Sequence, residues 1–281
     1  MMDAQFWAKA WEEARRDSSL YAKPTDPKKW EDFWNLFSKS YARRNRDTQT
    51  FQDTIISRLQ AQGVFNERSL VLDIGCGPGT YTLPLARHCR KVTGLDTAKE
   101  MLETLQNEAR LMNVADRIEV DSRDWADFPD QPRFDVAVGA NTPAIRDFQS
   151  LMKMNSVSRA YGCLINYAGR VTSTLRDGLW GDLVGSTLTS RAFDLQYPFN
   201  ILYQEGYWPN ILFFPYSHTV TEPLDYLILH FTCYFRIFGK EGLEVEEQIR
   251  RYLEQRVEDG LVEDIQKGAV SVIWWRSEKS P

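Results

Sequence analysis

The sequence has few of the residues that build covalent cross-links or metal sites. Only 4 of its 281 residues are cysteines and only 3 are histidines, and no two cysteines form a C-x-x-C pair. Without such pairs, or histidines at ligand spacing beside them, structural disulfides and structural zinc are not expected. No aspartate and asparagine set of the kind that holds a metal can be assembled either, so we predict no metal.

Long apolar runs and long basic runs are also missing. The first residues, MMDAQFWAKAWEEARRD, are charged where a signal peptide needs an apolar core. The most apolar stretch, 223–239, contains Asp225, His230 and Arg236 and is too short to span a bilayer. The net charge is −5 and the longest basic run is ARRNR, which argues against a nucleic-acid partner. The sequence predicts a cytoplasmic protein with no membrane partner.

Apolar side chains recur at helical spacing in the first sixty residues. Four aromatic residues follow the i, i+3, i+4, i+7 pattern: Trp30, Phe33, Trp34 and Phe37. We predict helices over 3–16 and 28–61, separated by KPTDP at 23–27. Residues 1–62 are therefore expected to form a helical segment that packs beside the main domain or acts as a lid over its site.

From about residue 69, short apolar runs alternate with amphipathic stretches. Seven runs predict strands: 69–75, 91–96, 117–125, 133–140, 162–169, 210–222 and 269–278. Such alternation is typical of the α/β class, here a doubly wound, mostly parallel seven-stranded sheet with helices on both faces. We assign this domain to residues 63–281, with a late helical insertion or cap at about 223–262.

Three glycines follow the first predicted strand, in VLDIGCGPG at 71–79. Gly75, Gly77 and Gly79 allow a ligand to approach the backbone closely. Dinucleotide enzymes favour G-x-G-x-x-G and place a pyrophosphate there, but here the third glycine comes one residue earlier. The carboxylate of Asp73 would repel a pyrophosphate and attract a cation, a difference of about a few kcal/mol. A nicotinamide oxidoreductase is therefore the disfavoured alternative.

VLDIGCGPG resembles the first motif of class I S-adenosylmethionine-dependent methyltransferases, and the resemblance extends in order over about residues 70–170. It implies that S-adenosyl-L-methionine is the cofactor and S-adenosyl-L-homocysteine the product. In the family an acidic residue ends the second strand and holds the ribose hydroxyls, which matches Asp96. Asp124 matches the residue that takes the adenine amino group, and Trp125 the one that lies against the base.

The resemblance also implies further donor contacts. The fourth strand would bring Ala140 and Asn141, in GANTPAI, close to the sulfonium. Tyr41, in SYARR, resembles a tyrosine that many relatives place over the donor, and Tyr81 follows the glycine turn. A plain packing role remains the alternative for both tyrosines.

The acceptor site is less defined by the sequence. His218, in FFPYSH, has a titration range suited to a general base, with a hydrogen-bonded histidine on a strand as the alternative. His88 and His230 are expected to be structural. Three aromatic residues are further candidates for an acceptor pocket, with a core role as the alternative: Tyr167, Tyr203 and Trp208. A run of arginines could hold an acidic acceptor or form a solvated helix face: Arg43, Arg44 and Arg46.

The predicted function is methyl transfer to a small-molecule acceptor. The segment ANTPA departs from the N/D-P-P-Y/F sequence of amino-directed DNA and protein-glutamine methyltransferases, which disfavours those substrates. Methylation of a protein or tRNA, and a non-catalytic protein that only binds the donor, remain alternatives. No oligomeric state follows from the sequence.

Overall fold

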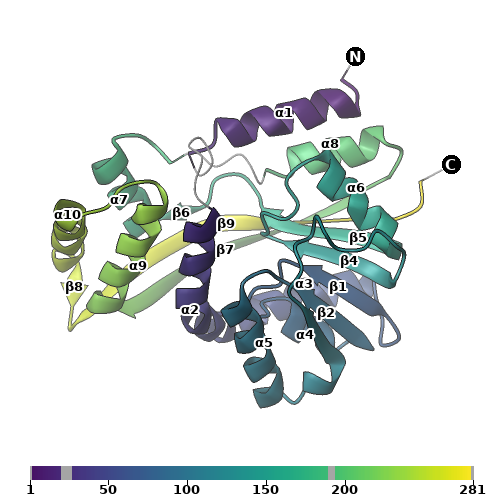
Figure 1. The fold of residues 1–281 in the computed structure, drawn as a ribbon, viewed down its shortest axis with the longest axis horizontal. Coiled ribbons are helices and arrows are strands. Elements are labelled where there is room, and N and C mark those ends of the chain that lie inside the picture. Colours follow the sequence, from purple (N-terminus) through teal and green to yellow (C-terminus); the bar gives the residue numbers. More distant parts are fainter. Residues whose placement is uncertain (1, 20–26, 189–193, 280–281) are drawn as a thin grey trace.

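A mostly parallel β-sheet forms the centre of the molecule (Figure 1). The computed structural model describes residues 2–19, 27–188 and 194–279. Five parallel strands follow one another: β1 (Leu70–Ile74), β2 (Lys91–Leu95), β3 (Ile118–Asp121), β4 (Phe134–Ala140) and β5 (Ser158–Tyr167). Their order across the sheet is β3-β2-β1-β4-β5. The chain therefore reverses its direction of progress between β1 and β4, which creates a crevice at their carboxyl ends.

A long antiparallel ribbon completes the sheet. β9 (Leu261–Arg276) lies antiparallel beside β5, and β7 (Asn210–Pro223) pairs with β9 along its whole length. Two short strands, β6 (Thr172–Ser173) and β8 (Val257–Glu258), also pair with β9. The described residues thus form nine strands, namely the seven predicted ones and these two. The predicted α/β, mostly parallel architecture is confirmed.

Alternate residues of the central strands enter two apolar clusters, one on each face of the sheet. Val71 and Val136 belong to one cluster, whereas their neighbours Leu72 and Ala137 belong to the other. This alternation is what a strand buried on both faces requires. The helices of the first cluster are α3 (Gln49–Ala61), α4 (Thr82–Ala86) and α5 (Lys99–Leu111), and those of the second are α1 (Ala4–Arg16), α6 (Phe148–Val157) and α8 (Gln196–Gln204).

The far part of the β7–β9 ribbon extends beyond the main sheet and has its own helices (Figure 1). A third apolar cluster joins it to three of them: α7 (Thr174–Val184), α9 (Leu224–Ile237) and α10 (Leu243–Glu254). α2 (Pro27–Asp47) contacts both α5 and α9. The N-terminal part of the chain is therefore packed against the helices that follow β7.

Several element boundaries differ from the predicted ones. β3 ends at Asp121 rather than at residue 125, so that Asp124 and Trp125 lie in a turn. β9 begins at Leu261 rather than at 269, because its first half pairs with β7 outside the main sheet. The predicted break at 23–27 falls outside the described residues except for its last position. Among the described residues, no helix is both long enough and apolar enough to cross a membrane.

Candidate functional site

One large cavity opens over the carboxyl ends of the parallel strands. Its volume is about 2600 Å³, and its walls come from the ends of β1, β2 and β4 together with α2, β7 and α9. Eleven of the predicted site residues line it: Tyr41, Asp73, Gly75, Gly77, Tyr81, Asp96, Asp124, Trp125, Ala140, Asn141 and His218. Ligands of doubly wound sheets bind at this edge, so the cavity is the candidate functional site.

The glycine turn after β1 forms the floor of the cavity. Gly75 has a φ of +67°, and a Cβ at this position would lie 2.0 Å from Oγ1 of Thr142. Gly77 has a φ of +52°, and a Cβ there would meet nothing within 4 Å. A residue without a side chain is therefore required at position 75, because Thr142 occupies the space that a Cβ would need. At position 77 the same space is open, and a ligand can approach the backbone there.

Gly79 was predicted to bind the cofactor, yet it does not line the large cavity. A Cβ at Gly79 would lie 2.6 Å from Leu105 and 2.9 Å from Leu83, and its φ is +98°. The residue therefore allows the turn to pack closely against α5. Its place in the structure supports a packing role.

Asp73 is the most buried charged group of the site, with 1% of its surface exposed. Its Oδ2 accepts a hydrogen bond of 2.6 Å from the hydroxyl of Thr82, whereas its Oδ1 is buried and has no partner among the described residues. Burial raises the pKa of Asp73 to about 6, the Thr82 hydrogen bond opposes this shift, and the charge of Asp96 adds to it. A cation bound at Oδ1 would remove the cost of this buried charge.

Asp96 follows β2 and is held by two backbone groups. Its Oδ2 accepts a hydrogen bond of 2.8 Å from the N–H of Gly77, and its Oδ1 accepts one of 2.9 Å from the N–H of Ala98. Burial raises the pKa of Asp96, and these two hydrogen bonds oppose that rise. The carboxylate is thus fixed in orientation, and each oxygen keeps a lone pair for a further donor such as a ligand hydroxyl.

Ala140 and Asn141 end β4 at the edge of the cavity. Asn141 has a φ of +46°, and its backbone N–H donates a hydrogen bond of 2.8 Å to the carbonyl of Ile165. Its side-chain Oδ1 is buried and has no partner among the described residues. Two unpartnered acceptor oxygens therefore lie at the carboxyl ends of β1 and β4, one on Asp73 and one on Asn141.

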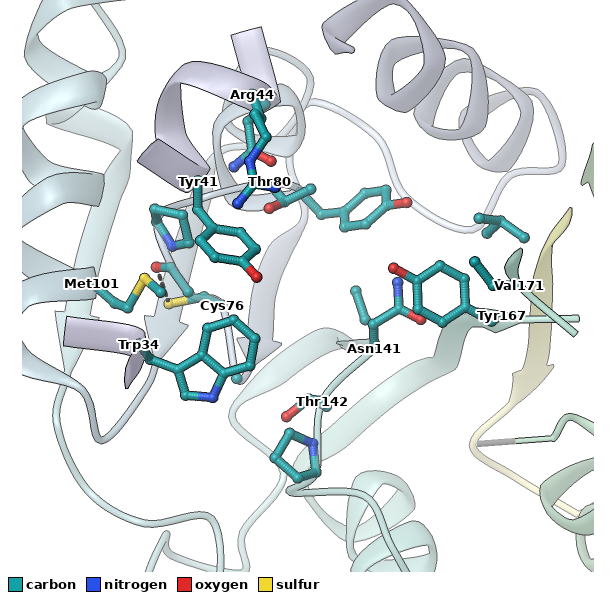
Figure 2. A pocket seen from close by; sticks show the side chains of 18 of the residues that line it. Trp34, Tyr41, Arg44, Cys76, Thr80, Met101, Asn141, Thr142, Tyr167 and Val171 are labelled. Carbon is teal, nitrogen blue, oxygen red and sulfur yellow. Dashed lines mark hydrogen bonds between the residues drawn. The ribbon is translucent and has the colours of Figure 1, made fainter. Parts of the chain in front are cut away.

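Tyr41 and Arg44 enter the same cavity from α2. Figure 2 shows the hydroxyl of Tyr41 directed toward the space that Asn141 and Tyr167 enter from the opposite side. The Arg44 guanidinium lies over the Tyr41 ring at 4.3 Å from its centroid, and its Nε and Nη2 are buried with no hydrogen-bond partner among the described residues. Burial raises the pKa of Tyr41 to about 12, against the opposing charge of Arg44. An unpaired guanidinium of this kind is suited to a carboxylate.

Tyr81 lies just after the glycine turn, at the start of α4. It lines the cavity and only 5% of its surface is exposed. Burial raises its pKa, so the phenol stays protonated and can donate a hydrogen bond. Tyr81 also belongs to the apolar cluster on this face of the sheet.

Asp124 and Trp125 lie in the turn that follows β3. Asp124 is exposed, and its Oδ1 accepts a hydrogen bond of 2.8 Å from the N–H of Ala126. Trp125 is buried, its indole N–H donates to the carbonyl of Ser150 at 3.2 Å, and its ring is stacked on that of Phe128 at 5.9 Å. One side of the Trp125 ring therefore packs in the apolar core, and another side lines the cavity.

His218 lies on β7 opposite Gln266 of β9 and lines the cavity. Its ring is 5.4 Å from that of Tyr216. Tyr203 and Trp208 were also candidates for the acceptor pocket. Both are exposed and neither lines this cavity, because Tyr203 on α8 and Trp208 in the loop after it lie on another face.

Sequence reasoning missed part of the site. Tyr226 was not considered and His230 was expected to be structural, yet both line the cavity. Arg44, for which an acidic acceptor and a solvated helix face were both considered, lines it as well. The available signal was the spacing of residues 226, 230 and 234 on one face of α9. This spacing predicts a shared helix face, although it does not tell which other element that face meets.

Comparison with known proteins identifies the central segment. Residues 71–160 match the family described as "Methyltransferase domain". An uncharacterized protein of Haemophilus influenzae is 32% identical over 96 residues, which cover 34% of this chain and 35% of that protein. The release factor glutamine methyltransferase of Agrobacterium fabrum is 29% identical over 113 residues, covering 40% of this chain and 38% of that protein. The chain thus matches little more than a third of the length of these relatives.

Residues 71–160 of this chain are thus similar to a methyltransferase domain. The suspected resemblance to class I S-adenosylmethionine-dependent methyltransferases is confirmed. A cyclopropane-fatty-acyl-phospholipid synthase-like protein from Lactobacillus casei has the same fold, with a TM-score of 0.50 and 18% sequence identity over 84% of this chain and 93% of that chain.

The resemblance implies S-adenosylmethionine as the cofactor, and the residues present fit it. Its amino-acid tail carries an ammonium, for which Asp73 and Asn141 offer unpartnered acceptors. The same tail carries a carboxylate, for which Arg44 offers two unpartnered donors. The open space at Gly77 allows the ligand to lie against the backbone. A zwitterionic ligand thus satisfies buried polar atoms that the protein itself leaves without partners.

No metal site accompanies the methyltransferase domain in the part of the chain that the structure describes. There, no group of three or more histidine, cysteine, aspartate or glutamate residues is arranged to hold an ion. All four cysteines are free thiols: Cys76, Cys89, Cys163 and Cys233.

Proposed function

We propose that this protein transfers the methyl group of S-adenosylmethionine to a small-molecule acceptor. The observation that carries this proposal is that the cavity at the donor residues continues, without a break, beneath α2 and α9. These helices cover part of the cavity and limit the size of what can enter from that side. A partly covered acceptor space of this kind favours a small molecule over a protein loop or an RNA.

The donor would be held by groups of both charges. Asp96 would accept hydrogen bonds from the ribose hydroxyls, and Asp124 one from the adenine amino group, with Trp125 against the base.

Asp73 and Asn141 would face the ammonium of the amino-acid tail, and Ala140 the sulfonium. Arg44 would bind the carboxylate, and Tyr41 would cover the donor from α2. Tyr81 would donate to the tail from the start of α4, whereas Gly75, Gly77 and Gly79 shape the turn itself.

The bound cofactor supplies an electrophilic methyl group on a positively charged sulfur. A lone pair of the acceptor forms the new bond to the methyl carbon, while the electron pair of the breaking C–S bond goes to sulfur. The protein contributes by holding the acceptor in line and by excluding water, an effect worth up to about 7–11 kcal/mol in favourable cases. If the acceptor must lose a proton, we propose His218 as the general base that receives it.

Two alternatives remain open. Methylation of a protein or tRNA has some support from the Agrobacterium relative, whose name describes a protein substrate. The net charge of −5 and the covered cavity favour a small molecule instead. A non-catalytic donor-binding protein would keep the same donor residues and lack transfer. We further propose a cytoplasmic location, which the four free thiols favour.

Calorimetry tests the donor first. We expect S-adenosylmethionine and S-adenosylhomocysteine to bind and NAD not to bind, and tight binding of NAD would reject the proposal. The acceptor class is tested with methyl-labelled donor and a cell extract. Label is expected in a new small molecule that passes a small-pore filter and is separated from the donor by chromatography. Label found only in precipitable protein or RNA would replace the small-molecule acceptor with a macromolecule, and donor binding without any transfer would support the non-catalytic alternative.

A further inference from the structure

The cavity has an aromatic wall where α2 and α9 meet. Trp30, Phe33 and Trp34 of α2 line it together with Tyr226, His230 and Tyr234 of α9. The two helices share an apolar cluster, so these rings are held in place by packing. Residues 226, 230 and 234 lie on one face of α9 because their spacing is four. This aromatic wall has the shape and polarity to hold a flat, mostly apolar molecule.

His230 is enclosed by rings. Its imidazole lies 4.8 Å from the Phe37 ring and 5.3 Å from the Phe33 ring, and it is stacked with Tyr226 at 5.8 Å and an interplanar angle of 29°. Its Nδ1 is buried and has no hydrogen-bond partner among the described residues. Burial lowers the pKa of His230 to about 3, the nearby charge of Arg44 lowers it further, and Asp264 opposes the shift. His230 is therefore neutral at physiological pH.

Tyr226 precedes His230 by one helical turn and has a second unpartnered group. Its hydroxyl is buried and makes no hydrogen bond to any described residue. Its ring packs edge-on against Phe37 at 5.9 Å. A buried polar atom without a partner lowers the stability of the fold by about 1–3 kcal/mol. The Tyr226 hydroxyl and His230 Nδ1 are two such atoms on adjacent turns of α9 at the cavity wall. They indicate that a ligand supplies the missing partners.

Three charged groups near this wall have partners within the protein. Glu222 forms an ion pair with Arg43. Arg176 donates to Asp177 at 2.9 Å. The buried carboxylate of Asp264 accepts four kinds of donor: the Ser173 hydroxyl, the Thr174 hydroxyl, the Leu175 N–H and the Gln266 amide. The unsatisfied atoms of Tyr226 and His230 therefore offer neutral hydrogen-bonding capacity.

We propose that the aromatic wall is the acceptor subsite, and that it takes a flat, uncharged aromatic or heteroaromatic molecule. A hydroxyl or ring N–H of that molecule hydrogen-bonds to the Tyr226 hydroxyl and to Nδ1 of His230. This inference rests on the proposed function, because it describes the second substrate of the same cavity. Tyr226 and His230 are positioning residues that select a polar group on an otherwise apolar ring.

The acceptor is expected to be uncharged for the same physical reason that the imidazole of His230 is neutral, namely burial among apolar rings. The burial that disfavours a charge on the imidazole also disfavours a charge on a ligand placed against it. Arg44 lines the same cavity and has no carboxylate partner among the described residues. The carboxylate of the donor would occupy it before an acidic acceptor could.

Three probes of one shape test the proposal on the full chain saturated with S-adenosylhomocysteine. They are 2-naphthol, which has a hydroxyl, naphthalene, which has no polar group, and 2-naphthoate, which is anionic. NMR titration is expected to give 2-naphthol the tightest binding, about tenfold or more over each of the other two. Tighter binding of 2-naphthoate would overturn the uncharged acceptor, and binding of no probe would overturn the subsite.

Conservative variants locate the contact. Tyr226→Phe and His230→Phe keep the ring packing and remove one polar group each. Each is expected to weaken 2-naphthol binding about tenfold, with naphthalene and S-adenosylhomocysteine affinities unchanged. Tyr203→Phe, at a tyrosine that is 58% exposed on α8, is the matched control. Unchanged 2-naphthol binding in both wall variants overturns the inference. Failure of the parent protein to bind S-adenosylhomocysteine, measured before any probe is added, instead overturns the proposed function and the inference with it.

Discussion

Gly77 donates its backbone N–H to the carboxylate of Asp96, with 2.8 Å between the nitrogen and Oδ2. This hydrogen bond connects the glycine turn after β1 to the end of β2. It holds the acidic side chain in one orientation before any ligand arrives, so less conformational freedom is lost when a ribose binds. The two motifs therefore act as one preorganised unit.

Replacing Asp96 tests the ribose contact. Asp96→Asn keeps the size of the side chain but loses the charge that accepts from two hydroxyls. We expect S-adenosylhomocysteine to bind about 2–3 kcal/mol more weakly, on the scale of hydrogen bonds to charged groups. Calorimetry measures the change, with Asp116→Asn at an exposed site as the control. Equal affinities for the parent and Asp96→Asn would remove Asp96 from the donor site.

The glycine turn allows a matched comparison of three alanine variants. Gly75→Ala places a Cβ 2.0 Å from Thr142 and should destabilise the fold severely. Gly77→Ala and Gly63→Ala have φ values of +52° and +73° and no neighbour within 4 Å, so each should cost only about 1–2 kcal/mol of backbone strain. Only Gly77→Ala should also weaken donor binding, because Gly63 lies outside the cavity.

Urea unfolding gives the stability of each of these variants, and calorimetry gives the donor affinity. The interpretation of Gly77 fails if Gly77→Ala and Gly63→Ala bind the donor equally well. If Gly75→Ala is as stable as Gly77→Ala, the contact with Thr142 does not restrict position 75 to glycine.

The raised pKa of Asp73 predicts a pH-dependent stability. Because burial raises this pKa to about 6 from 3.8, the folded state binds more protons than the unfolded state between these values. Stability therefore falls as pH rises through this window and levels off above it. Relative to Asp73→Asn, the parent should lose up to about 3 kcal/mol of unfolding free energy between pH 4 and pH 7.5. Urea unfolding at both pH values measures the difference, and a pH-independent difference would contradict the prediction.

The same ionisation should control donor binding. Above pH 6 the carboxylate of Asp73 is charged and attracts the donor's ammonium, and below pH 6 it is neutral. We expect the affinity for S-adenosylhomocysteine to fall below pH 6 in the parent and to change less in Asp73→Asn. Calorimetry over pH 5 to 8 follows both proteins. Parallel pH profiles would show that Asp73 does not face the ammonium.

Arg44 can be tested with a truncated ligand. 5′-Methylthioadenosine has the same nucleoside as the donor but lacks the amino-acid tail. Arg44→Ala should weaken S-adenosylhomocysteine binding by about 2–3 kcal/mol, the value of a charged hydrogen bond, and leave 5′-methylthioadenosine unaffected. Arg68→Ala is the control, because Arg68 lies outside the cavity. Equal losses for both ligands would show that Arg44 supports the site without binding the carboxylate.

The sequence by itself determined where the sheet strands lie along the chain and the position of the donor turn. Both depend on local rules: a strand buried on two faces is apolar at successive positions, as in 70–72, and a backbone that approaches a ligand must do without side chains, as at Gly77. The acidic residues at the carboxyl ends of β1 and β2 were equally visible, because parallel strands bring these ends to one edge.

The tertiary structure decided the acceptor half of the cavity. His230 lies in an apolar helix, so the local pattern predicted a structural residue. Arg44 lies in a basic run, and the local pattern did not distinguish a binding role from a solvated helix face. Both line the cavity because α2 packs against α9, a contact between segments far apart in the sequence. Periodicity tells which side chains share a face, but whether a buried polar atom has a partner depends on what the rest of the fold places opposite it.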